Sequence, residues 1–365
     1  MRAAALAMLA LALALPPLVA AEPARAEPVT LVTPLAYGTH LPGLGEPAAS
    51  LAKLIKDRSG GTLLLDLKQP GEGTKPQDIL DAVSAGKVDA GFSTASYWSA
   101  KLPAASLFAG YPFGPDGKTY LDWFEQGNGR KLYQEMYDHA ELKVHVMPCG
   151  FGGAEAGGWF AKEIKTSEDL KGLRMRIFGL GGRVMARLGA TTVLVPGGDI
   201  LAAFDKKQID AAELYPPAAD AQSGLKDKVK LIYVPGWHQP ETVLELIVNK
   251  DRWDALTDRE RGLIDGACLA TLQATLDSSA KLQADALADF AKSGVRIENF
   301  PPGVLASLHQ AWTDVAEDEG DQDYFFRTVL DDIEKFTAKS QSPSPPAAPN
   351  VSAEPSAQAE TKATP

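Results

Sequence analysis

Apolar positions along this chain follow two patterns, one with the period of a strand and one with that of a helix. Short apolar runs predict strands at 30–32, 63–67 and 88–92, and helical spacing predicts helices at 47–56 and 76–85. The same order returns later, with predicted strands at 173–178, 193–195 and 209–214 and predicted helices at 183–188 and 200–204. Alternating strands and helices are typical of an α/β fold with a mostly parallel sheet.

One stretch of sequence occurs twice. Residues 78–90 and 199–211 align without gaps, and each stretch begins with Asp-Ile-Leu and ends with an aliphatic residue followed by Asp-Ala. A helix of fixed length that leads into a strand has therefore been used twice. The repeat predicts two similarly built lobes.

Three longer segments predict how these lobes are joined. Residues 145–147 and 242–248 are apolar enough to be strands that cross between the lobes and form a hinge. Thr257 and Glu260 make a capping box, after which helical periodicity continues to about Lys292 and stops at Gly294. At 1.5 Å per residue this helix is about 50 Å long, enough to brace both lobes.

The two ends of the chain differ from the rest. Residues 1–26 have the features of an export signal: Arg2, an apolar run too short to span a bilayer, Pro16-Pro17, and a small-residue cleavage site that ends at Ala26. Residues 341–365 are almost entirely Ser, Pro, Ala, Gln, Asn, Thr and Glu, with one aliphatic side chain in Val351, which predicts a disordered tail. The intervening chain is longer than a single core usually organises. We expect lobe I at 27–147 plus about 242–275, and lobe II at 148–241 plus about 276–340.

The charge balance excludes one class of partner. Without the signal, 34 Lys and Arg face 46 Asp and Glu, and the chain has no basic stripe, so we expect no nucleic-acid binding. Cys149 and Cys268 are far apart and lack the spacing of metal ligands. They could pair in an oxidising compartment, but their apolar neighbours favour two buried free thiols.

Motifs of common enzymes are absent: the sequence after the signal has no G-x-S-x-G, H-E-x-x-H, P-loop or EF-hand loop. A glycine-rich run begins at Gly179, but Val184 replaces the third glycine of a dinucleotide loop, so we interpret the run as a tight turn. The helix N-terminus after that turn can assist an anion through free backbone N–H groups.

Two arginines alternate on one predicted strand. Arg174 fits a solvated strand edge, whereas Arg176, near the carboxyl end of the strand, is well placed to meet a carboxylate in a cleft between the lobes.

The region 169–212 resembles the substrate-binding proteins of tripartite ATP-independent periplasmic (TRAP) transporters. It carries the strand with arginine, the glycine-rich turn, Arg-Leu-Gly-Ala at 187–190, Pro196, Asp199 and Ile-Asp-Ala at 209–211. The similarity extends to Ser-Ala-Gly-Lys-Val-Asp-Ala at 84–90 and Gly-Gly-Trp-Phe at 157–160. It implies a two-lobed α/β periplasmic binding protein of type II-like fold with hinge strands and a long bracing helix.

The resemblance also implies a function. The protein is expected to reside in the periplasm, to bind a small organic acid, most specifically a 2-oxo or 2-hydroxy acid, and to deliver it to a TRAP membrane permease. The ligand carboxylate would meet Arg176, and a cation, sodium or calcium, would be held by Glu155 and Glu213. Glu155 stands where family members often carry an amide, which raises the negative charge of the site.

Aromatic side chains complete the predicted ligand site: Tyr97, Trp98, Phe178 and Trp237, with His238 as a donor to a ligand oxygen. Two alternatives share these observations. Glu155 and Glu213 could be the paired carboxylates of a periplasmic hydrolase or lyase that acts on small acids. The same fold also serves receptors of ATP-driven importers, which would lack the long bracing helix.

Overall fold

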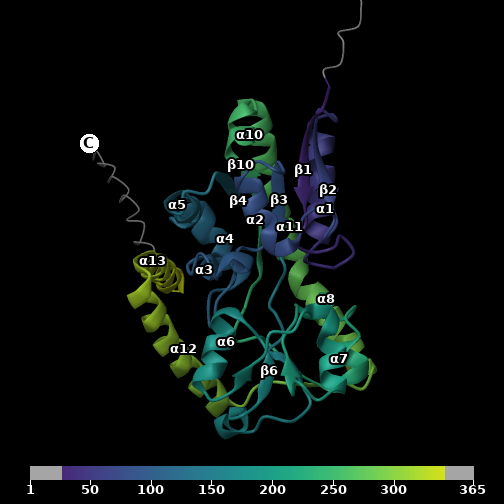
Figure 1. Ribbon diagram of the computed structural model, residues 1–365, viewed down its shortest axis with the longest axis vertical. Helices are drawn as coiled ribbons and strands as arrows, with labels where there is room; N and C mark the ends of the chain where they lie inside the picture. Colours follow the sequence, from purple (N-terminus) through teal and green to yellow (C-terminus); the bar gives the residue numbers. More distant parts are fainter. Residues whose placement is uncertain (1–26, 342–365) are drawn as a thin grey trace, which may run out of the picture.

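The structure, a computed structural model, describes residues 27–341. These residues form two lobes, which lie one above the other in Figure 1. The predicted export signal at 1–26 and the predicted tail beyond Gln341 lie outside the described residues.

The first lobe contains two small sheets. One joins β1 (Val29–Pro34) to β2 (Leu63–Lys68) in parallel, and the other has the order β3 (Ala90–Ser93), β10 (Val243–Asn249), β4 (Val144–Phe151). A bridge between Leu35 and Phe92 connects them. The helices of this lobe are α1 (Glu46–Arg58), α2 (Ile79–Ser84), α3 (Ala105–Ala109), α4 (Gly117–Gln126), α5 (Gly129–His139) and α10 (Lys250–Ala255).

The second lobe is built on one six-stranded sheet. Its order is β11 (Arg296–Glu298), β9 (Leu231–Tyr233), β5 (Gly158–Phe160), β8 (Ala211–Ala212), β6 (Arg174–Arg176), β7 (Thr191–Thr192). Its helices are α6 (Gly179–Arg187), α7 (Ile200–Asp205), α8 (Pro217–Asp220) and α9 (Leu225–Lys228).

The prediction of mostly parallel sheets is confirmed, with one reversed strand in each lobe. β10 runs antiparallel to both its neighbours, and so does β5. The reason lies in the connections: β4 leads out of the first lobe and β10 leads back into it, and paired strands of that kind must point in opposite directions. The other ladders are parallel, as expected for strands separated by helices.

One predicted strand is displaced. Residues 193–195 were expected to be a strand, but β7 ends at Thr192, and only the amide of Val193 continues the ladder, to the carbonyl of Met175. The carbonyl of Val195 instead accepts a hydrogen bond from the side chain of Arg176. A side chain has therefore replaced the neighbouring strand as the partner of this backbone.

The internal repeat is visible in the structure. A 3-10 turn (Pro76–Asp78) leads into α2 and then β3, and a second 3-10 turn (Gly197–Asp199) leads into α7 and then β8. The paired helices have the same length and the following strands begin at equivalent positions, Ala90 and Ala211. Each lobe thus contains one copy of the unit.

The predicted long helix is α11 (Asp258–Lys292), with 35 residues. Thr257 and Glu260 form the predicted capping box at its start. α11 begins against α1 and β4 of the first lobe and reaches α8 and β11 of the second, so it braces both lobes. This confirms the predicted brace.

A disulfide joins Cys149 to Cys268, so the prediction of free thiols was wrong. Cys149 lies on β4 and Cys268 on α11, and the close packing of that helix on that strand brings their Cα atoms to 4.3 Å. The bond ties the bracing helix to a strand that leads into the second lobe.

The last two helices lead the chain from the second lobe back to the first. α12 (Pro302–Gln322) lies along α6 of the second lobe, whereas α13 (Tyr324–Gln341) packs against α3, α4 and α5 (Figure 1). The expected assignment of residues 276–340 to lobe II therefore does not hold for α13. No helix within residues 27–341 is both long and apolar enough to cross a membrane.

Candidate functional site

A cavity of about 600 Å³ lies between the two lobes. Its wall in the first lobe includes Tyr37, Ser96 and Tyr97. The second lobe contributes the carboxyl end of β6, the start of α6, the segment 194–197 and the segment after β8. The cavity thus lies where the carboxyl ends of parallel strands meet, which is where α/β sheets usually bind ligands.

Arg176 is the only lysine or arginine in the described lining of this cavity. Its Nε donates to the carbonyl of Val195 (3.2 Å), and Nη1 donates to both the backbone carbonyl and the side chain of Glu213. The guanidinium also lies over the ring of Phe178, with Cζ 4.5 Å from the ring centroid. Within the described residues Nη2 forms no hydrogen bond. This end of a rigidly held guanidinium is therefore available to bind a ligand.

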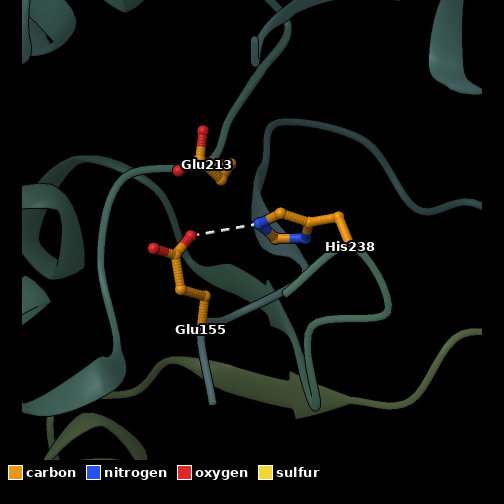
Figure 2. A group of neighbouring side chains, drawn as sticks. All are labelled: Glu155, Glu213 and His238. Atoms are coloured by element: carbon orange, nitrogen blue, oxygen red, sulfur yellow. Dashed lines mark hydrogen bonds and ion pairs between the residues drawn. The ribbon is translucent and has the colours of Figure 1, made fainter. Parts of the chain in front are cut away.

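Two carboxylates and an imidazole, those of Glu155, Glu213 and His238, converge on one another (Figure 2), and Glu213 is also paired with Arg176. One ligand atom from each of Glu155, Glu213 and His238 lies within 4.8 Å of the other two, and all three residues are buried. Nε2 of His238 is 3.1 Å from Glu155 Oε2, and Gln239 donates to Oε1 of the same carboxylate at 2.9 Å. The chain has gathered these groups from three separate segments.

Burial dominates the electrostatics of this cluster. It is the main reason that the pKa of Glu155 is raised to about 7. The pKa of Glu213 is also raised to about 7, first by burial and then by the charge of Glu155, against the lowering effect of Arg176. The two carboxylates therefore compete for the single positive charge of Arg176, and the pair retains protons that exposed carboxylates would lose.

His238 has an unsatisfied atom. Burial lowers its pKa, so the ring is neutral, and Nδ1 is buried without a hydrogen-bond partner among the described residues. Its position depends on glycine: a Cβ at Gly181 would lie 2.9 Å from the Cβ of His238. The glycine-rich start of α6 therefore lets the helix N-terminus and His238 approach the same cavity.

The predicted aromatic residues divide into two groups. Tyr97 and Phe178 line the cavity, and Phe178 remains 51% exposed. Trp98 and Trp237 are buried and do not line it. Trp98 donates to Glu245, and Trp237 lies against Phe113, with ring centroids 5.9 Å apart.

Sequence reasoning missed other lining residues. Tyr37 and Tyr215 pack edge to face with ring centroids 6.0 Å apart, and Leu194 lines the cavity with 83% of its surface exposed. Gln239 fixes Glu155. Tyr215 stands two residues after Glu213, a spacing that could have suggested it, but Tyr37 and Leu194 carry no local signal of their role.

The oxygen-rich cluster has the donors that hard cations prefer. Two buried carboxylates with raised pKa lack sufficient positive charge around them, and a cation between them would supply it. The geometry of Glu155 and Glu213 thus fits the predicted cation site.

Residues 43–322 match the family of bacterial extracellular solute-binding proteins, family 7 (DctP). The chain belongs to this family. A curated relative, a monocarboxylate 2-oxoacid-binding periplasmic protein of Nostoc sp., is 33% identical over 289 residues, which cover 79% of each chain. The protein is accordingly a periplasmic TRAP receptor and not an enzyme.

Solved structures of TRAP periplasmic solute-binding proteins share the fold. One from Colwellia psychrerythraea, with bound calcium and pyruvate, has 28% identity and a TM-score of 0.81 over 86% of this chain and 96% of that one. Another from Pseudoalteromonas atlantica, with sodium and pyruvate, has 28% identity and a TM-score of 0.80 over 86% and 95%. A third from Bordetella bronchiseptica, with calcium and picolinate, has 26% identity and a TM-score of 0.81 over 86% and 93%.

Proposed function

We propose that this receptor captures a 2-oxo monocarboxylate, whose carboxylate binds Arg176 beside a cation held by Glu155 and Glu213. The observation that carries the proposal is the placement of one rigid, buried arginine next to two buried carboxylates in a cavity between lobes. The ligand is then delivered to a TRAP membrane permease, as members of the family do.

The charge of the cavity favours one carboxylate over two. Arg176 supplies the only cationic side chain of the described lining, and His238 is neutral because burial lowers its pKa. A second carboxylate would lie among Tyr97, Phe178 and Leu194 without a charged partner, which is costly in a desolvated site. A short 2-oxo acid with an apolar side chain avoids that cost.

A cation would balance the excess negative charge of the cavity. Glu155 and Glu213 together carry up to two negative charges against Arg176, and an anionic ligand adds a third. A bound cation would neutralise the two carboxylates and offer positive charge to the ligand. The solved relatives with calcium or sodium beside pyruvate or picolinate support this arrangement.

Capture requires the lobes to close. The cavity wall carries exposed apolar groups from both lobes, Leu194 and Phe178 from the second and Tyr97 from the first, that a closed form would bury. The chain passes between the lobes at 152–157 and 234–242, next to the predicted hinge strands β4 and β10. We expect a smaller radius of gyration with ligand in solution scattering, and an unchanged profile at saturation would contradict closure.

Titration calorimetry on the protein without its export signal tests the function. Pyruvate and its longer homologues should bind in the presence of calcium or sodium, whereas succinate and 2-oxoglutarate should bind much more weakly. The recovered ligand should be chemically unchanged by mass spectrometry. Failure of every 2-oxo monocarboxylate to bind with either cation present would overturn the proposal, and conversion of the ligand would favour the enzyme alternative.

A further inference from the structure

Glu245 is a buried carboxylate outside the ligand cavity. It lies on β10 and has no exposed surface. Trp98 Nε1 donates to Oε1 at 2.8 Å, and the hydroxyls of Tyr133 and Tyr137 donate to Oε2 at 2.6 and 2.8 Å. Three side chains from two elements therefore meet on one carboxylate.

Burying a carboxylate destabilises the fold unless hydrogen bonds satisfy its oxygens. Removing a carboxylate from water has a large desolvation penalty, which hydrogen bonds must offset. An apolar residue would fill the same space in β10 without that penalty. The three donors suggest that Glu245 fixes the elements that carry them.

The two carboxylate oxygens serve different parts of the lobe. Oε2 accepts from Tyr133 and Tyr137 of α5, neither of which lines the cavity. Oε1 binds Trp98, the last residue of the 3-10 turn Ala95–Trp98. This turn presents Ser96 and Tyr97 to the cavity.

Ring contacts continue from Trp98 towards the site. Trp98 and Tyr97 lie 6.0 Å apart between centroids, Tyr97 and Tyr37 5.9 Å, and Tyr37 and Tyr215 6.0 Å. Tyr215 follows β8 and belongs to the second lobe, close to Glu213. The position of Trp98 therefore affects a row of aromatic rings that reaches across the cavity.

We propose that Glu245 is a positioning residue for ligand binding: through Oε1 it anchors Trp98 and so fixes the cavity wall formed by Ser96 and Tyr97. The inference rests on the proposed function for its binding readout, but the anchoring itself can be measured without ligand.

Trp98→Phe tests the anchor, because it removes the indole N–H and keeps an aromatic ring. Trp123→Phe is the matched control: Trp123 is also buried in the first lobe, and its indole donates at 2.7 Å to a carboxylate, that of Asp332, away from the cavity. Tyr137→Phe is a second control, since it removes one bond to the same Glu245 from the side of α5.

We expect Trp98→Phe to weaken pyruvate binding by about 10-fold, the effect of losing roughly one charge-assisted hydrogen bond. Both controls should change the dissociation constant by less than about 2-fold, even where they lower the melting temperature comparably. Calorimetry well below all melting temperatures makes the comparison. Equal effects on affinity in Trp98→Phe and Trp123→Phe would overturn the proposal.

Hydrogen exchange of the ligand-free protein separates this inference from the proposed function. The amides of Lys101 and Leu102 both donate to the carbonyl of Trp98, and they should exchange faster in Trp98→Phe but not in the controls. Unchanged exchange would refute the anchor whatever ligand binds. If Trp98→Phe does not fold, the wild-type indole N–H of Trp98 decides: it should be as protected as these amides, and rapid exchange would contradict the proposal.

Discussion

Two ion pairs flank the short strand β8, and they have the same chemistry in different surroundings. Arg174 binds Asp210 at 2.7 Å, with the side chains 41% and 21% exposed. Arg176, two residues further along β6, binds Glu213 at 2.9 Å, with both side chains 7% exposed. The Arg174–Asp210 pair lies at the surface of the second lobe, whereas the Arg176–Glu213 pair lies in the ligand cavity.

The difference shows what distinguishes a structural pair from a binding site. Asp210 is fully used: it accepts from Nε, Nη2 and the backbone amide of Arg174. Glu213 is paired with Arg176, whose charge also acts on Glu155, and Nη2 of Arg176 has no hydrogen bond within the described residues. The Arg174–Asp210 pair is exposed, so it contributes little and needs no further charge. The Arg176–Glu213 pair is buried beside Glu155, so it needs a further partner to balance its charges.

The largest expected effect follows from removing the cavity arginine. Arg176→Ala should weaken ligand binding by about 30-fold to several thousand-fold, because a desolvated carboxylate loses its partner. Arg176→Lys should also bind distinctly worse, since lysine lacks the planar fork. Calorimetric titration of folded variants measures both, and near wild-type affinity in Arg176→Ala would remove the basis of the proposed site.

A smaller effect is expected from lowering the charge of the cation site. Glu155→Gln should weaken calcium binding by at least about 10-fold and sodium binding less, because calcium affinity depends on the number of charged ligands. Glu241→Gln, in another buried acid outside the cluster, is the control. Calorimetry with each cation measures the difference, and equal calcium affinity in wild type and Glu155→Gln would exclude Glu155 as a charged ligand.

The contributions of Glu213 and Asp210 to the free energy of unfolding should change with pH in opposite directions. The pKa of Glu213 is raised from 4.5 to about 7 by burial, so without cation or ligand its contribution to the free energy of unfolding is present below about pH 4.5 and is lost as the pH rises to about 7. The pKa of Asp210 is lowered from 3.8 by its bonds to Arg174, so its contribution is present above pH 3.8 and is lost on acidification.

Urea unfolding between pH 3 and 8 measures this difference. Glu213→Gln should flatten the decrease in stability between about pH 4.5 and 7, while Asp210→Asn should affect only the acid end. If Glu213→Gln left the profile unchanged, Glu213 would not carry a raised pKa in the folded protein.

The smallest effect is expected for the exposed Arg174–Asp210 pair. Arg174→Ala should change ligand affinity by less than about 2-fold and should lower the free energy of unfolding only slightly, because the pair is largely solvated. The same calorimetric and urea measurements apply. A loss of affinity comparable to that of Arg176→Ala would show that the two pairs act together.

The sequence predicted the lobes, the brace and the strand with Arg176, because these depend on local periodicity and on residue order. It did not predict which neighbouring aromatics face the cavity. Tyr97 and Trp98 are adjacent in a 3-10 turn, where successive side chains point about 120° apart, so only one of them can face the ligand. Trp237 and His238, adjacent in a bend, also take different environments, one buried against Phe113 and the other beside Glu155.

Other features required the tertiary structure. Tyr37 and Tyr215 meet only because the two lobes approach each other. The direction of β5 and β10 follows from how the chain passes between lobes, and the pairing of the cysteines follows from the contact of α11 with β4. None of these contacts leaves a pattern within a single stretch of sequence.

The disulfide has a topological consequence for the whole molecule. Its two cysteines are 119 residues apart, and the loop that they close contains the strands β5 to β10 with Arg176, Glu213 and His238. In the unfolded chain a closed loop of this size loses conformational freedom worth about 4–5 kcal/mol in chain-entropy terms. A single backbone cleavage anywhere between the cysteines, for instance at the exposed Leu194, would leave two fragments that remain covalently joined.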